Sequence, residues 1–130
     1  MKMIAKQLSV FIENRPGRLG EVLNVLKENK VNIQSLSLAD TTEYGLLRLI
    51  VDKPEEGKEK LFSAGFSSML TDVLIVKIPH NPGSLQNILK VISDKNISVE
   101  YMYGLTVAGD EASVVVKTSD LKTACEVFGE

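Results

Sequence analysis

Two Pro-Gly turns carry the residue types in this sequence that could bind a small charged ligand. The first reads Asn-Arg-Pro-Gly at residues 14–17, and the second reads His-Asn-Pro-Gly at residues 80–83. Each turn follows apolar residues in alternation and precedes apolar residues at helical spacing, so it lies where a strand passes into a helix. The first N–H groups of a helix lack internal partners and carry the positive end of the helix dipole. Each turn is therefore a candidate site for a carboxylate or phosphate group.

A purely structural interpretation of these turns is also open. Asn81 would then be a helix N-cap and Pro82 the first helical residue, and Gly83 would serve only to let a neighbouring group pack close to the backbone. Asn14 lies one position too early to cap the first helix in this way, which leaves its amide for other partners. Because an amide both donates and accepts hydrogen bonds, it suits the ammonium and carboxylate groups of an amino acid. Asn32, at the start of the next strand-like segment, is either a cap or turn residue or a second ligand amide.

Other candidate side chains also have two interpretations. His80, the single histidine, is either a structural turn residue or a contact to a ligand carboxylate that makes affinity depend on pH. Tyr101 and Tyr103, which alternate with Met102, either pack across a sheet or form an apolar pocket wall. The single cysteine, Cys125, cannot form a disulfide within the chain, and we expect it to be half-buried on the last helix.

A shift of 66 residues superimposes the two turns and shows that the chain is a tandem duplication. The identities run through strand, turn and helix in one register without a gap. They pair Leu8, Val10, Ile12, Pro16, Gly17, Leu19, Leu23 and Val25 with Leu74, Val76, Ile78, Pro82, Gly83, Leu85, Leu89 and Val91.

The apolar spacing predicts the order β-α-β-β-α in each copy, with Pro16 and Pro82 at the first helical position. The expected strands lie around residues 8–12, 31–38, 44–51, 66–70, 74–78, 97–106 and 112–118, and the remaining expected helices lie near 55–64 and 119–128. This order indicates the α+β class with two ferredoxin-like βαββαβ modules, in residues 1–70 and 71–130. Because the second copy stops just after its last helix, its fourth strand is short or missing, or another segment covers that sheet edge.

The composition argues against several function classes. The formal net charge of −2 gives no sign of a nucleic-acid or basic membrane surface. RNA-recognition modules share the expected topology, but they stack bases on strand aromatics, and the first strand offers only Phe11. The sequence has no 18-residue apolar run and no signal-peptide pattern, so we expect a cytoplasmic protein. With one histidine and no G-x-x-x-x-G-K loop, we expect no metal, no cofactor and no catalysis.

The segment ENRPGRLGEVLNVLKENKVNI resembles the regulatory ACT domain, a small βαββαβ module that binds amino acids. It is especially similar to the version that ends bacterial phosphoglycerate dehydrogenases, in which an Asn-Arg-Pro-Gly turn precedes Val-Asn-Ile. The second copy, IPHNPGSLQNILKVISDKNISV, is a looser match that keeps Asn-Pro-Gly-Ser-Leu. The resemblance covers nearly the whole chain as two ACT modules, and we expect no catalytic domain.

The resemblance implies that two modules pack side by side through helix one and strand two, sharing an antiparallel sheet with the helices on one face. Ligand would lie at this interface, between the turn of one module and the second strand of the other. One expected cleft joins Asn14, Arg15, Pro16, Gly17, Arg18 and Leu19 with Ser98, Tyr101, Met102 and Tyr103, and the other joins His80, Asn81, Pro82, Gly83, Ser84 and Leu85 with Asn32 and Gln34. Ile12 stands where the dehydrogenase version has a histidine, and Ser98 replaces the equivalent of Asn32, so the resemblance does not imply serine as the ligand.

The resemblance therefore implies a non-catalytic regulatory or sensor protein that binds a free amino acid between two modules. Its expected partner is an enzyme of amino-acid metabolism, and a homodimer is compatible with this function. Neither nucleic acid nor membrane is an expected partner. The alternative is an oligomerisation or adaptor module without a small-molecule ligand, which would self-associate whether or not an amino acid is present.

Overall fold

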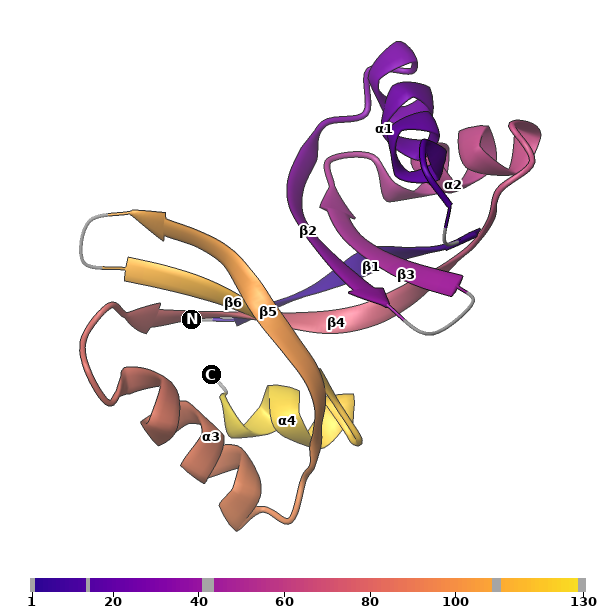
Figure 1. Ribbon diagram of the computed structural model, residues 1–130. Coiled ribbons are helices and arrows are strands. Elements are labelled where there is room, and N and C mark those ends of the chain that lie inside the picture. Colours follow the sequence, from indigo (N-terminus) through magenta and orange to yellow (C-terminus); the bar gives the residue numbers. More distant parts are fainter. Residues whose placement is uncertain (1, 14, 41–43, 109–110, 129–130) are drawn as a thin grey trace. The chain divides into compact units, whose positions relative to one another are not determined.

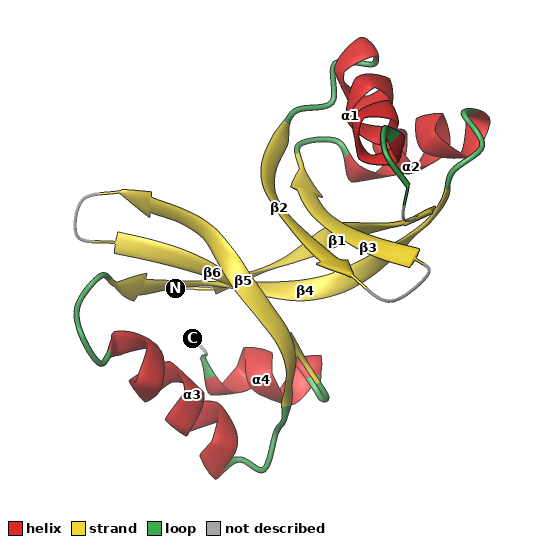
Figure 2. Ribbon diagram, in the orientation of Figure 1, coloured by secondary structure: helices red, strands yellow, loops and turns green. Residues whose placement is uncertain are grey.

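A computed structural model describes residues 2–13, 15–40, 44–108 and 111–128 of the chain (Figure 1). The helices and strands follow the predicted order, except that the strands expected around residues 66–70 and 74–78 form one continuous strand (Figure 2). The strands are β1 (Lys2–Glu13), β2 (Ile33–Asp40), β3 (Tyr44–Val51), β4 (Ser67–Pro79), β5 (Val99–Ala108) and β6 (Glu111–Thr118). The helices are α1 (Arg18–Glu28), α2 (Pro54–Ser63), α3 (Ser84–Asp94) and α4 (Leu121–Val127). The fold is α+β, with an antiparallel sheet of ferredoxin-like modules, as the sequence predicts.

The chain divides by its contacts into two compact units. The first unit is Lys6–Thr71, and the second combines Met1–Ala5 with Asp72–Glu130. The boundaries fall inside β1 and β4, so each of these two strands contributes residues to both units. Each unit has its own apolar core.

The first unit has the strand order β2-β3-β1-β4. In the antiparallel pairs Val10 lies opposite Leu47, and Leu36 lies opposite Leu49. Because alternate residues of a strand face the same side, Leu8, Val10 and Ile12 all point toward the helices. Val22 and Leu26 of α1 and Leu61 of α2 belong to the same buried cluster, so both helices cover one face of the sheet.

Gly57 explains how closely α2 approaches this core. A Cβ at position 57 would lie 3.2 Å from Leu8 Cδ2 and 3.5 Å from Leu26 Cδ2. The absence of a side chain therefore lets the backbone of α2 rest directly on β1 and α1. The position suits glycine for packing rather than for backbone conformation.

The second unit repeats this plan with the strand order β5-β6-β4-β1. Its core combines Leu74 and Val76 of β4 with Ile92 of α3 and Ala124 of α4. The sequence left the fourth strand of this copy open, and the start of β1 occupies that place beside β4. The unit thereby covers a sheet edge that would otherwise present unpaired backbone groups.

Candidate functional site

The two Pro-Gly turns have the same backbone conformation. The Arg18 N–H donates to the Arg15 carbonyl at 3.4 Å, and the Ser84 N–H donates to the Asn81 carbonyl at 3.2 Å. Gly17 has φ 89° and ψ −16°, and its counterpart in the second turn has φ 89° and ψ −13°. A four-residue turn with proline second and a left-handed residue third is a type II β-turn, which requires glycine at the third position.

This geometry corrects two expectations about how the helices begin. Pro16 and Pro82 precede the helices instead of occupying their first positions, because the turn places proline before the left-handed glycine. Asn81 is not the N-cap of α3, since Gly83 holds that position. No described side chain caps α1 or α3, so beyond Arg18 and Ser84, whose N–H groups close the turns, the first N–H groups of these helices have no side-chain cap.

Arg18 is held by contacts within the first unit. Its guanidinium carbon lies 4.3 Å from the centre of the Phe66 ring. Its Nε lies 3.3 Å from Glu13 Oε1, and its Nη1 pairs with Glu21. Only 19% of the side chain is exposed. Arg18 therefore braces the start of α1 against the end of β1 and against Phe66, the residue before β4.

A hollow of about 200 Å³ lies beside the first turn, and we call it the turn hollow. Its charged lining residues, Glu13 and Arg15, each have 56% of the side chain exposed, and Arg15 Nε lies 3.4 Å from Glu13 Oε1. The lining combines the end of β1, the turn, α1, the end of β2 and the start of β3. It consists of Ile12, Glu13, Arg15, Leu19, Leu38, Ala39 and Gly45. Of these residues, the sequence predicted only Arg15 and Leu19 as ligand-binding.

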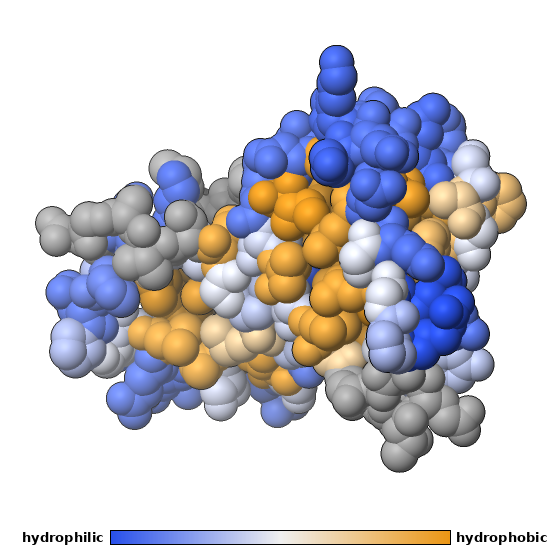
Figure 3. Space-filling model, turned by 45° about the horizontal axis from the view of Figure 1, so that its top comes forward, coloured by the Kyte–Doolittle hydropathy of each residue, from blue (hydrophilic) through white to orange (hydrophobic). Residues whose placement is uncertain are grey.

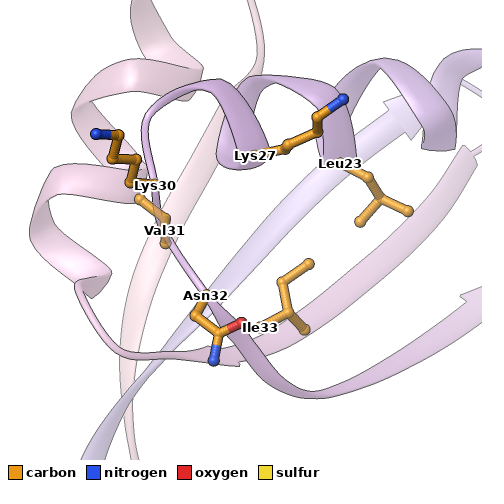
Figure 4. A pocket seen from close by; sticks show the side chains of 6 residues that line it. All are labelled: Leu23, Lys27, Lys30, Val31, Asn32 and Ile33. Carbon is orange, nitrogen blue, oxygen red and sulfur yellow. The ribbon is translucent and has the colours of Figure 1, made fainter.

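A second hollow, of about 420 Å³, surrounds Asn32 at the start of β2 (Figure 4). Leu23 of α1 and Ile33 of β2 extend toward each other across it. The Asn32 N–H donates to Asp52 Oδ1 at 2.8 Å, and the Asn32 carbonyl accepts from the Asp52 N–H at 3.1 Å. These bonds hold the backbone of Asn32 and leave its exposed side chain at the surface. Lys27 and Lys30 contribute positive charge to the same hollow.

The two hollows lie at opposite ends of α1 and β2 within the first unit. A helix of 11 residues is ~16 Å long, so the turn that precedes α1 is far from Asn32, which follows it. In the described part of the chain, β2 has one neighbouring strand, β3. Leu36 and Leu38 on β2 are 48% and 49% exposed. Figure 3 shows apolar side chains gathered on the face over the strands of this unit.

The remaining candidates of the first unit lie on these elements. Pro16 and Gly17 are exposed in the turn, and Leu19 is half-buried on α1. Gln34 is exposed on β2 beside an irregularity in the pairing with β3. Asn14, the asparagine of the first turn, lies outside the described residues.

Some of the predicted ligand-binding residues of the second unit take part in its packing or in its backbone hydrogen bonds. His80 is exposed in the turn. The Ser98 N–H donates to Ser119 Oγ at 3.0 Å, as the Asn32 N–H donates to the Asp52 side chain in the first unit. Met102 packs against the core of this unit. Tyr101 and Tyr103 are half-buried, and their alternation with Met102 puts them on the opposite face of the sheet. The other candidates here are Asn81, Pro82 and Gly83, exposed in the turn, and Ser84 and Leu85, on the first turn of α3.

Two further properties concern metals and membranes. The described residues contain no group of three or more His, Cys, Asp or Glu side chains arranged to hold a metal ion. None of the helices that the structure describes combines the length and apolar character needed to cross a membrane.

The fold and the paired turns define a class of protein with two duplicated ferredoxin-like modules. A comparison with protein-family models matches residues 3–129 to the family described as ACT domain pair, and the chain belongs to this family. The comparison with curated proteins found no match.

Solved structures extend the comparison. Protein BT0572 from Bacteroides thetaiotaomicron is 36% identical, with a TM-score of 0.92 over 98% of this chain and 88% of that one. The regulatory subunit of aspartate kinase from Thermus thermophilus, in its ligand-free form, has a TM-score of 0.69 at 15% identity over 97% of this chain and 93% of that one. The corresponding subunit from Thermus flavus has a TM-score of 0.64 at 16% identity, over 88% and 86%. At these identities the two kinase subunits show the shared fold alone.

Proposed function

We propose that this protein is a non-catalytic regulatory protein that binds a free amino acid beside the first Pro-Gly turn. The observation that carries the proposal is the pair of opposite charges, Glu13 and Arg15, beside an uncapped helix start. A free amino acid carries one ammonium and one carboxylate group on neighbouring atoms. Arg15 and the N–H groups at the start of α1 would bind the carboxylate, and Glu13 would bind the ammonium. Membership of the ACT domain pair family supports this function.

The second part of the proposed site comes from another copy of the module. Asn32 and Gln34 lie at the opposite end of β2 from the turn, so one module cannot offer both parts to one ligand. Two β2 edges paired antiparallel would bring the start of one strand beside the end of the other. We therefore propose a homodimer through this edge, whose exposed Leu36 and Leu38 would become buried. The regulated partner would be an enzyme of amino-acid metabolism, because two proteins of similar fold are regulatory subunits of aspartate kinase.

Calorimetry with each of the standard amino acids tests this function. We expect one or a few to bind more tightly than about 1 mM, and Arg15→Gln to weaken that binding about ten-fold or more by removing a charged hydrogen bond. Lys90→Gln is the matched control, since Lys90 is an exposed cation on α3 that pairs with Asp94. Absence of binding by every amino acid would refute the sensor function.

The exposed leucines of β2 favour one alternative, an oligomerisation adaptor without a ligand. Light scattering with and without the amino acids distinguishes the two functions. An adaptor would form the same oligomer in both conditions and would bind none of the amino acids. A ligand that bridges two copies would strengthen their association, because it binds the assembled state more tightly than the separated one.

A further inference from the structure

The lining of the turn hollow carries information about the side chain of the ligand. Ile12 is 5% exposed and Leu38 is 49% exposed, and both extend beside Gly45. A Cβ at position 45 would lie 3.2 Å from Ile12 Cγ1 and 3.5 Å from Leu38 Cδ1. The missing side chain at Gly45 therefore helps to leave the hollow open. Together with Leu19, these groups offer a ligand side chain apolar contacts within the described lining.

The size and charges of the hollow restrict the ligand further. Its volume of about 200 Å³ lies below the ~300–1,000 Å³ of pockets for drug-sized molecules, so it suits a molecule of amino-acid size. Arg18 is engaged with Glu21 and Phe66, which leaves Arg15 as the more accessible guanidinium of this turn. Glu13 and Arg15 are thus the charged groups of the described lining, and Ile12, Leu19 and Leu38 are its large apolar side chains.

The second turn lacks these features. At the turn, the 66-residue shift replaces the charged Glu13 and Arg15 with the uncharged Pro79 and Asn81. In the strand pairing Gly45 lies opposite Ile12, and its counterpart opposite Ile78 is Ala112, while the counterpart of Leu38 is Gly104. The two turns share a backbone conformation but differ in the side chains that would recognise a ligand.

From these observations we infer that the turn hollow of the first unit binds an α-amino acid with an apolar side chain, and that the second turn does not bind it. This inference rests on the proposed function and specifies its ligand class. The apolar side chain lies among Ile12, Leu19 and Leu38, while its ammonium and carboxylate groups meet Glu13 and Arg15. The preference comes from the apolar contacts that Ile12, Leu19 and Leu38, among the described lining residues, offer to the ligand side chain.

Calorimetry on the full chain with amino acids matched in shape tests the ligand class. Valine against threonine and leucine against asparagine compare apolar with polar side chains of similar size. We expect the apolar member of each pair to bind about ten-fold or more tightly than the polar one. Tighter binding of threonine and asparagine would overturn the ligand class and leave the proposed function standing. If no amino acid binds, the proposed function itself fails.

Two glycine variants test the location of the site. Gly45→Ala places a methyl group against Ile12 and Leu38, and we expect it to weaken the binding of the preferred amino acid about ten-fold. Gly104→Ala is the matched control, because a Cβ there meets nothing within 4 Å, and its affinity should equal that of the unmodified protein. If Gly45→Ala does not fold, Leu38→Ser tests the same location, because Leu38 is half-exposed and its replacement should disturb folding less. Unchanged affinity in a folded Gly45→Ala or Leu38→Ser variant would overturn the location.

Discussion

Replacing Gly17 with alanine tests whether the backbone of the type II turn is what requires glycine. Gly17 has φ 89°, and a Cβ at this position would meet nothing within 4 Å. The cost of the substitution is therefore backbone strain without a steric clash. An L-residue in the left-handed region costs about 1–2 kcal/mol, so we expect the free energy of unfolding to fall by that amount.

Three further variants bracket this magnitude. Gly83→Ala should have the same effect in the second unit, because Gly83 also has φ 89°. Gly17→Asn should lose less stability than Gly17→Ala, since asparagine tolerates the left-handed region better. Gly20→Ala is the control with the opposite sign: Gly20 lies within α1 with open space around it, so alanine should stabilise the protein by up to about 1 kcal/mol.

Urea unfolding followed by far-UV circular dichroism measures these differences. We expect shifts of the midpoint with an unchanged slope, and parallel shifts of the melting temperature of about 4 °C per kcal/mol. A Gly17→Ala variant as stable as the unmodified protein would refute the reasoning. So would a Gly17→Asn variant less stable than Gly17→Ala, because strain in the left-handed region predicts the reverse order.

Three other predictions concern a helix cap, a side-chain brace and a strand. Hydrogen bonds from the Thr123 hydroxyl and N–H lower the pKa of Asp120. Asp120→Ala should therefore lower the melting temperature at pH 7. The difference in melting temperature between the variant and the unmodified protein should shrink as the pH falls through the lowered pKa. Arg18→Met should lower the free energy of unfolding by about 1 kcal/mol, and Phe66→Leu should lower it less in the Arg18→Met background than in the unmodified protein. A double-mutant cycle of urea midpoints measures this difference, and full additivity of the two substitutions would contradict the contact. Deleting residues 1–5 should raise hydrogen exchange in residues 72–79 by exposing a sheet edge, and unchanged protection would contradict the pairing.

Local features of the fold could be predicted from the sequence. The 66-residue repeat, the alternation around Val10 and the helical spacing of Leu19 and Leu23 depend on neighbours along the chain, and they predicted the element order. The same residues predicted a turn at each Pro-Gly pair. They did not predict where α1 and α3 begin, because two turn types accommodate proline and only the backbone angles of Gly17 and Gly83 distinguish them.

Several features of the candidate site depend on residues far apart in the sequence. No local pattern indicates that Phe66 receives the Arg18 guanidinium, or that Gly45 and Leu38 form a hollow with Ile12. The start of β1 likewise joins the second unit because β4 is long enough to offer each unit a neighbouring segment. The sequence by itself determined the repeated elements and the chemistry of their turns, since these follow from local spacing. Only the tertiary structure decided which distant side chains surround the first turn, because packing brings together residues that no sequence period relates.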